Sequence, residues 1–307
     1  MKELPYQREL VRFWSASTAG FAAALFRIAF GLLAVWTALG VLLNRERYFS
    51  QQGMIPWRVV SEHNWSSWSL LAIAPESDRW LFVVCCALLV ASFGYLLGAA
   101  PRLCSAVIFV VHVSLHHRNP YIFNSGDRLF LMLSSLGVFL PLGRVASLSA
   151  LWRSRRPSAT ELPPAGIWSQ RLIQLQICHV YWFSCFSKLR HAGWQQGTAM
   201  RDVLVSPVFS EWPVQLDASL PALLLTWGTL LFEFGFPLAV FNERLRRPAL
   251  IAGVLFHLGI ELSMKIPMFS AIMAVSYALF LQEHEAKWLL CRVGLAGSSI
   301  RGAATAS

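Results

Sequence analysis

The sequence predicts an all-α, polytopic integral membrane protein, a helical bundle with about eight transmembrane helices. Of the 307 residues, 56% are hydrophobic and only 14% are charged, and the mean hydropathy is +0.51. Several segments stay apolar for the roughly 20 residues that a helix needs to cross a bilayer. Polar residues inside these segments recur at steps of three and four, which is the helical period. Together these observations exclude an ordinary soluble domain.

We expect the spans at about residues 18–43, 80–98, 103–116, 127–142, 168–188, 221–241, 249–265 and 267–283. The third and fourth are short and could tilt or enter the membrane only partly, so the count could differ by one. The first apolar run is too long for the hydrophobic region of a signal peptide. The expected organisation is an N-terminal cytoplasmic segment, a transmembrane domain and a C-terminal cytoplasmic tail, at residues 1–15, 16–285 and 286–307.

The distribution of Lys and Arg predicts the orientation. If the N-terminus is cytoplasmic, fourteen of these residues fall on the cytoplasmic side and nine on the outer side, and Arg27, Arg171 and Lys188 lie in the membrane. The positive-inside rule then places both termini in the cytoplasm of a bacterial cell and the end of the fifth span outside. The net charge of +10 is spread over short loops. The lipid bilayer is therefore the expected partner, and nucleic acid is not.

The fifth span carries a polar stripe that ends in a lysine. Its members follow one another at steps of three and four and share one helical face: Arg171, Gln174, Cys178, Tyr181, Cys185 and Lys188. Lys188 lies about 30 Å beyond Trp168, at the outer edge of the hydrocarbon. Two interpretations stay open. Lys188 extends to the headgroups, or it is a desolvated amine that acts as a base.

Three further charges, Arg27, Glu233 and Glu261, lie near the expected midplane of their spans. We expect a buried charge cluster, which is either a polar clamp or a site in which one carboxylate carries a proton. His257, Glu261 and Lys265 follow at steps of four along one face of the seventh span. Such inward polar faces favour a cavity that opens outward near Lys188.

Asn124-Ser-Gly-Asp127 is a turn signal before the fourth span, in which Asp127 could be the helix N-cap. On the outer side, this segment is a candidate for the cavity mouth.

The His112-(x)3-His116-His117 spacing fits one histidine box of membrane di-iron enzymes. The remaining histidines stand alone, so we interpret His112 as a buried hydrogen-bonding residue and expect no metal site. The six cysteines form no CxxC motif and are interpreted as packing residues. A redox role stays open for Cys178 and Cys185, which share a face.

The sequence resembles a known family. The resemblance rests on these motifs, in chain order: Arg27-Ile-x-Phe-Gly31, Tyr48 through Gly53-Met-Ile-Pro56, Asn124-Ser-Gly-Asp127, Gln174-x-Gln176-(x)4-Tyr181-(x)6-Lys188-Leu-(x)4-Trp194-(x)2-Gly197, Glu233 before Pro237, and Phe256-His257 ahead of Phe269. They resemble the HTTM family, the membrane domain of vitamin K-dependent gamma-carboxylases and their bacterial relatives. The resemblance covers residues 15 to 283.

The resemblance implies a function and a site. It places Lys188 at the family's catalytic lysine and Asn124, Asp127, Tyr181, Trp194 and His257 in the substrate and cofactor pocket. It implies a reduced quinone (vitamin K hydroquinone or menaquinol), with O2 and CO2 if the reaction is a carboxylation, and an exported peptide as the modified partner.

The chain also departs from the carboxylases. Ser125 stands where they have a histidine, and some 24 residues follow the last expected span, too few for their substrate-docking region. Short chains of this kind resemble the sporulation-delaying-protein B type, which helps to mature an exported peptide toxin. A non-enzymatic maturation or export partner is therefore the first alternative, and a proton-coupled transporter using Glu233 and Glu261 is the second.

Overall fold

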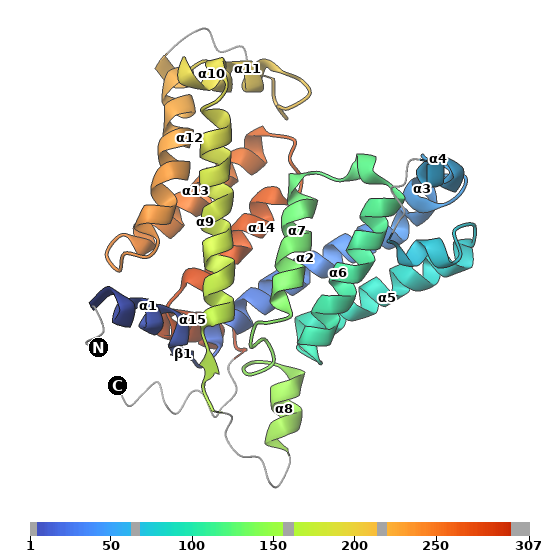
Figure 1. The fold of residues 1–307 in the computed structure, drawn as a ribbon, viewed down its shortest axis with the longest axis horizontal. Helices are drawn as coiled ribbons and strands as arrows, with labels where there is room; N and C mark the ends of the chain where they lie inside the picture. The colour runs from blue at the N-terminus through green and yellow to red at the C-terminus, as the bar shows by residue number, and fades with distance from the viewer. Residues whose placement is uncertain (1–4, 63–67, 156–162, 214–219, 296–307) are drawn as a thin grey trace. The chain divides into compact units, whose positions relative to one another are not determined.

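The computed structural model describes residues 5–62, 68–155, 163–213 and 220–295, and these form an all-α protein, as predicted (Figure 1). The chain divides into two compact units. The first comprises Met1–Arg171 with Leu281–Ser307, and the second comprises Leu172–Phe280. Each unit is described by itself below.

The first unit is built around consecutive packed helices. The helix α2 packs on α5, α5 on α6, α6 on α7, and α15 on α2. Two short strands pair antiparallel, with Ser17 opposite Gly166. The elements are α1 (Pro5–Ser15), β1 (Ser17–Thr18), α2 (Phe21–Leu43), α3 (Arg45–Phe49), α4 (Trp57–Glu62), η1 (Leu70–Ile73), α5 (Asp78–Leu97), α6 (Pro101–Arg118), η2 (Pro120–Ile122), α7 (Ser125–Gly137), α8 (Leu148–Ser154), β2 (Ala165–Gly166) and α15 (Glu283–Arg292).

The second unit carries the expected site. Its helix α9 contacts α12, and α12 packs on α13, with α10 and α11 at one end of α9 and α12 (Figure 1). The backbone N–H of Met200 in α11 donates to the Thr226 hydroxyl of α12 at 3.1 Å and fixes that end. The elements are α9 (Trp168–Lys188, which begins in the first unit), α10 (Ala192–Gln195), α11 (Ala199–Val205), α12 (Leu220–Ala239), α13 (Arg246–Ser263), α14 (Phe269–Ser276) and η3 (Tyr277–Phe280).

Three of the described helices, α2, α5 and α12, are long and apolar enough to cross a membrane. This finding indicates an integral membrane protein. All eight segments predicted as spans are at least partly helical, and α9 has the predicted bounds. However, α7 has 13 residues and α14 has 8, which is short of the roughly 20 that a span requires. The count of eight, the domain bounds and the orientation therefore stay predictions; residues 1–4 and 296–307 of the two predicted tails lie outside the described residues.

The second unit encloses several polar side chains among its buried apolar ones and exposes many large apolar side chains, which is unusual for a soluble protein. The stripe along α9 faces inward, since Gln174, Tyr181 and Cys185 are all buried. The exposed side chains of the same unit are large and apolar, and they include Phe183, Phe186, Leu224, Leu231, Ile251, Leu255 and Leu262. This arrangement suits a helix bundle in lipid whose interior encloses polar groups.

Arg27 is fully buried in the first unit and holds the chain after α7 against α2. Its guanidinium donates to the carbonyl oxygens of Leu142 at 2.9 Å, of Val145 at 3.4 Å and of Ala146. It also lies against Gly98, the left-handed residue that ends α5. The expected cluster of Arg27 with Glu233 and Glu261 stays a prediction, because Arg27 lies in the first unit and the two carboxylates lie in the second. Backbone carbonyls accept from both terminal nitrogens of this buried cation, as they can wherever a turn aims several carbonyls at one point.

The approach of α2 to α5 gives the first prediction. A Cβ on Gly31 would lie 2.7 Å from the Leu96 Cα, whereas a Cβ on Gly40 of the same helix would meet nothing within 4 Å. We expect Gly31→Ala to destabilise the protein by about 1–3 kcal/mol through overpacking, and Gly40→Ala to be neutral or stabilising. Thermal unfolding of the purified variants in detergent checks this. Equal melting temperatures would contradict the close packing.

Candidate functional site

Lys188 ends α9 and makes an ion pair with Glu233 of α12. The Lys188 side chain is 25% exposed to solvent, whereas the Glu233 side chain is only 6% exposed. The ammonium also lies over the Trp194 indole, with Nζ 5.0 Å from the ring centroid. Lys188 therefore does not simply extend to the headgroups. It is held between a carboxylate and an aromatic face.

Ser184 completes this group. Lys188 Nζ donates to the Ser184 hydroxyl at 3.0 Å, and that hydroxyl donates to Glu233 Oε1 at 3.0 Å. Since Ser184 is one helical turn before Lys188, α9 itself aims both side chains at the same oxygen. The triangle fixes both the distance and the orientation of the ion pair.

The contact between α9 and α12 extends beyond the ion pair. The Trp182 indole N–H donates to the Phe234 carbonyl at 3.1 Å, and the Cys185 thiol to the Leu230 carbonyl at 3.7 Å. Cys178 and Cys185 are both buried free thiols. Polar contacts along two turns therefore hold Glu233 opposite Lys188.

A second polar group lies deeper in the same unit, centred on the Tyr181 hydroxyl. This oxygen is hydrogen-bonded to His257 Nε2 of α13 at 2.7 Å and to the Tyr277 hydroxyl. Gly253, one turn from His257, lets the Tyr277 ring approach closely, because a Cβ there would lie 2.6 Å from its hydroxyl oxygen. Tyr181 and His257 were both predicted as site residues, and the structure brings them into direct contact.

Several buried polar atoms of this unit have no hydrogen-bond partner in the described part of the chain. Glu233 Oε2 and His257 Nδ1 are the two that belong to the groups described above. Aromatic rings surround the Tyr181 ring between them, with Phe232 at 5.5 Å and Phe236 at 4.7 Å between centroids. Buried polar groups are normally satisfied, so such atoms indicate positions where a ligand or water could bind.

Glu261 does not join this group, which corrects its expected place at the midplane. Ala249, Gly253 and His257 are buried at steps of four along α13, and the next step reaches Glu261, which is exposed. The reason is the position of the helix, which begins at Arg246 and ends at Ser263. Glu261 is therefore in its last turn. Lys265, expected on the same face, lies beyond the helix end, and its ammonium donates to the Pro207 carbonyl at 3.0 Å.

Asn124 and Asp127 form a reciprocal cap at the start of α7 in the first unit. The Asn124 side chain accepts from the Gly126 N–H at 2.6 Å, and Asp127 Oδ2 accepts from the Asn124 N–H at 2.9 Å. The N-cap is therefore Asn124 and not Asp127, which is the third residue of the helix. Both side chains have a structural role, and their place in a pocket stays a prediction.

A model of the HTTM domain matches residues 17–288. The chain belongs to the HTTM family. It is also similar to the sporulation-delaying protein SdpB of Bacillus subtilis (strain 168), at 24% identity over 167 residues. That match covers 52% of this chain and 51% of SdpB, so it spans about half the length of that relative. No solved structure matches the chain.

The histidine box of this HTTM chain does not gather ligands in the structure. Among the described residues, no group of three or more His, Cys, Asp and Glu side chains is placed to hold a metal ion. His112 is buried with its ring 4.7 Å from that of Phe130, and His117 Nδ1 hydrogen-bonds the Trp68 carbonyl at 2.7 Å. His112 therefore packs in the core of the first unit, and His117 anchors the loop at Trp68.

Sequence reasoning missed two members of the site in this HTTM chain, Ser184 and Tyr277. Ser184 had a visible signal, because it lies four residues before Lys188 on the same helical face. Tyr277 had none. Its contact with Tyr181 joins residues 96 positions apart and depends on how the helices pack.

Proposed function

We propose that this chain is a membrane enzyme of the HTTM family in which Lys188 acts as a base toward a reduced quinone, for the modification of an exported peptide. One observation carries the proposal. Lys188, at the end of the polar stripe of α9, is held by Glu233 and Ser184 and covered by an indole ring. A lysine used only as an anchor at the membrane surface would turn toward water.

The ion pair itself offers a route to a neutral amine. Moving one proton along the hydrogen bond from Lys188 Nζ to Glu233 Oε1 converts two opposite charges into an amine and a carboxylic acid. In a dry site the charged pair loses much of its advantage, because desolvation opposes it. The Ser184 hydroxyl, which is hydrogen-bonded to both groups, holds Lys188 Nζ beside Glu233 Oε1. The amine could then accept a proton from an acidic hydroxyl beside it.

The unpartnered atoms suggest how a reduced quinone would be held. When bound, a hydroquinone supplies a hydroxyl group whose deprotonation makes it reactive toward O2. Glu233 Oε2 and His257 Nδ1 are free to hydrogen-bond its oxygens, and Phe232, Phe236 and Trp194 would exclude water from its ring. If the reaction is a carboxylation, CO2 is the second substrate. Tyr181 holds His257 in place from the opposite ring nitrogen.

The test uses the full chain purified into lipid nanodiscs, with chemically reduced menaquinone or vitamin K and O2. We expect quinol-dependent O2 consumption that falls at least about 100-fold in Lys188→Ala, the scale of a lost general base. Lys265→Ala is the matched control, since that lysine is exposed on the same unit. Equal rates in wild type and Lys188→Ala would contradict the role of Lys188.

A non-enzymatic role in peptide maturation or export is the second candidate, and the similarity to SdpB favours it. Under that role the ion pair would only join α9 to α12. Changes within residues 44–78 or 189–220 would then impair the peptide's appearance outside the cell, and Lys188→Ala would not. Secretion assays of both classes of variant separate the two candidates.

A further inference from the structure

A charged pocket lies where α2 and α3 meet the start of α5, in the first unit. Its volume is about 310 Å³, and its lining includes Arg45, Glu46, Asp78, Arg79, Phe82 and Val83. The segment that forms one wall is firmly held. Arg118 donates to the carbonyls of Ser50 at 2.7 Å and of Ile55 at 2.8 Å, and Asn119 to that of Tyr48 at 2.9 Å. The pocket is therefore a built feature of the fold.

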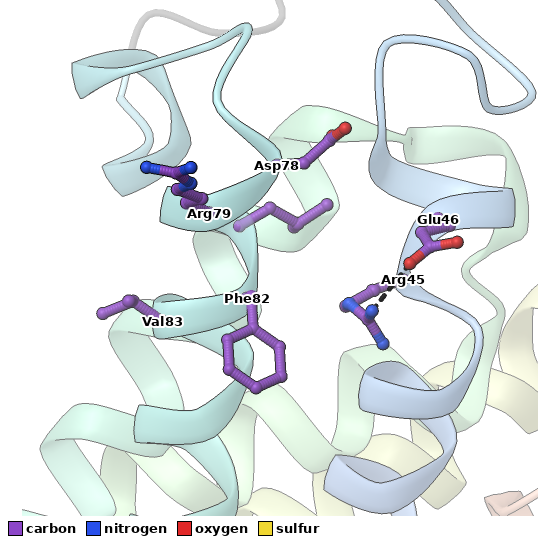
Figure 2. Close-up of a pocket in the computed structure, with 7 residues that line it drawn as sticks. Arg45, Glu46, Asp78, Arg79, Phe82 and Val83 are labelled. Carbon is purple, nitrogen blue, oxygen red and sulfur yellow. Dashed lines mark hydrogen bonds and ion pairs between the residues drawn. The ribbon is translucent and has the colours of Figure 1, made fainter.

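Arg45 is the best-placed cation in this pocket. It donates to Glu46 Oε1 at 2.6 Å and to the Leu42 carbonyl at 3.0 Å, and its guanidinium lies 5.3 Å from the centre of the Phe82 ring. Figure 2 shows Arg45 and Phe82 turned toward each other, with Glu46 beside Arg45. The Arg45 side chain is 28% exposed, so it is fixed but remains accessible.

The remaining charges lie on the first turn of α5. Asp78 and Arg79 are both exposed. In Figure 2, Arg79 and Val83 lie on the other side of α5 from Arg45. The pocket thus presents two cations and two carboxylates that sum to zero. Such a set complements a ligand that carries both signs rather than a simple anion.

An apolar groove continues from this pocket between α5 and α6. Its volume is about 330 Å³, and its lining is entirely apolar, including Trp80, Val84, Ala87, Val107 and Val110. Val83 lines both the charged pocket and the groove, so the two adjoin. Val84 and Ala87 lie about 9–14 Å along the helix from Asp78, at about 1.5 Å per residue. Because α5 is long and apolar enough to cross the membrane, this depth corresponds to acyl chains.

We propose that this pocket and groove bind one zwitterionic phospholipid with a primary amine headgroup, a phosphatidylethanolamine. Arg45 takes the phosphate, and Glu46 and Asp78 accept from the ammonium. Arg79, on the same side of α5 as Val83, takes a glycerol ester carbonyl at the head of the groove, and one acyl chain fills the groove. Phosphatidylglycerol has no ammonium to donate to the two carboxylates. Phosphatidylcholine has no N–H to donate to them. This inference does not depend on the proposed enzymatic function.

The experiment is native mass spectrometry of the full chain, delipidated in detergent and titrated with phosphatidylethanolamine, phosphatidylglycerol or phosphatidylcholine of identical acyl chains. We expect one phosphatidylethanolamine to bind at least about tenfold more tightly than either of the others, the scale of one lost charge-assisted hydrogen bond. Equal binding of the three lipids, or tighter binding of phosphatidylglycerol, would overturn the proposal.

Variants locate the site. Arg79→Ala, at an exposed position, and Ala87→Trp, which fills the groove, should each weaken phosphatidylethanolamine binding about tenfold at unchanged thermal stability. Arg58→Ala is the matched control. Its side chain is 89% exposed and pairs with Glu62 of α4, away from the pocket lining. Unchanged binding in both Arg79→Ala and Ala87→Trp would show that the lipid binds elsewhere.

Discussion

Lys188→Met is expected to destabilise the protein by about 3 kcal/mol, because it leaves the Glu233 carboxylate buried without its cation. The carboxylate side chain retains only 6% exposure and cannot turn to water without moving α12. Glu233→Gln should cost less, about 1–2 kcal/mol, since Lys188 ends its helix, is 25% exposed and can extend outward. The order of the two effects is the prediction.

The double variant Lys188→Met/Glu233→Gln should recover most of the loss. Replacing both members of a buried ion pair is often close to neutral, whereas removing one member is not. We expect a coupling free energy of about 1.5 kcal/mol or more between the two substitutions. Thermal unfolding of the four proteins in one detergent measures it. Additive effects would show that the pair does not exist in the folded protein.

Arg27→Met is expected to destabilise the first unit by about 3 kcal/mol or more, since it leaves the carbonyls of Leu142 and Ala146 without their buried donor. The methionine also cannot fill the space of the guanidinium beside Gly98. Arg102→Met, at an exposed position near the start of α6, is the control with the same change of charge. The measurement is again the melting temperature in detergent. A shift no larger than that of Arg102→Met would contradict the clamp.

Much of the fold could be predicted because hydropathy indicates where the long helices lie and the helical period indicates which face of a helix is buried. The bounds of α9 and the inward stripe ending at Lys188 were predicted, and the structure has both. Helix ends that lie outside apolar runs could not be predicted as well from the sequence. The start of α13 at Arg246 lies among charges, so hydropathy placed the span three residues late and assigned Glu261 to the midplane. Hydropathy also does not show which side chain caps a helix, so Asn124 was not predicted as the N-cap of α7.

The sequence predicts which side chains of the site share a helical face, but it does not predict which residues of other helices they contact. Periodicity shows that Lys188 and Tyr181 share one face of α9, and depth suggested that Arg27 and Glu233 lie at one level. Which helices face each other depends on packing between distant segments. The structure pairs Glu233 with Lys188 and leaves Arg27 to backbone carbonyls. A charge near the midplane therefore indicates that a partner exists without identifying it.

The most direct test of the account is the rate of quinol-dependent O2 consumption by the Lys188→Met/Glu233→Gln variant, measured beside the wild type in nanodiscs. This variant lacks both the amine and the carboxylate that would take its proton, but we expect it to keep most of its stability, so a change in rate reports the chemistry of the ion pair and not the fold. The account predicts a wild-type rate that is at least about 100-fold above that of the variant. A folded double variant with the wild-type rate would contradict a base at Lys188.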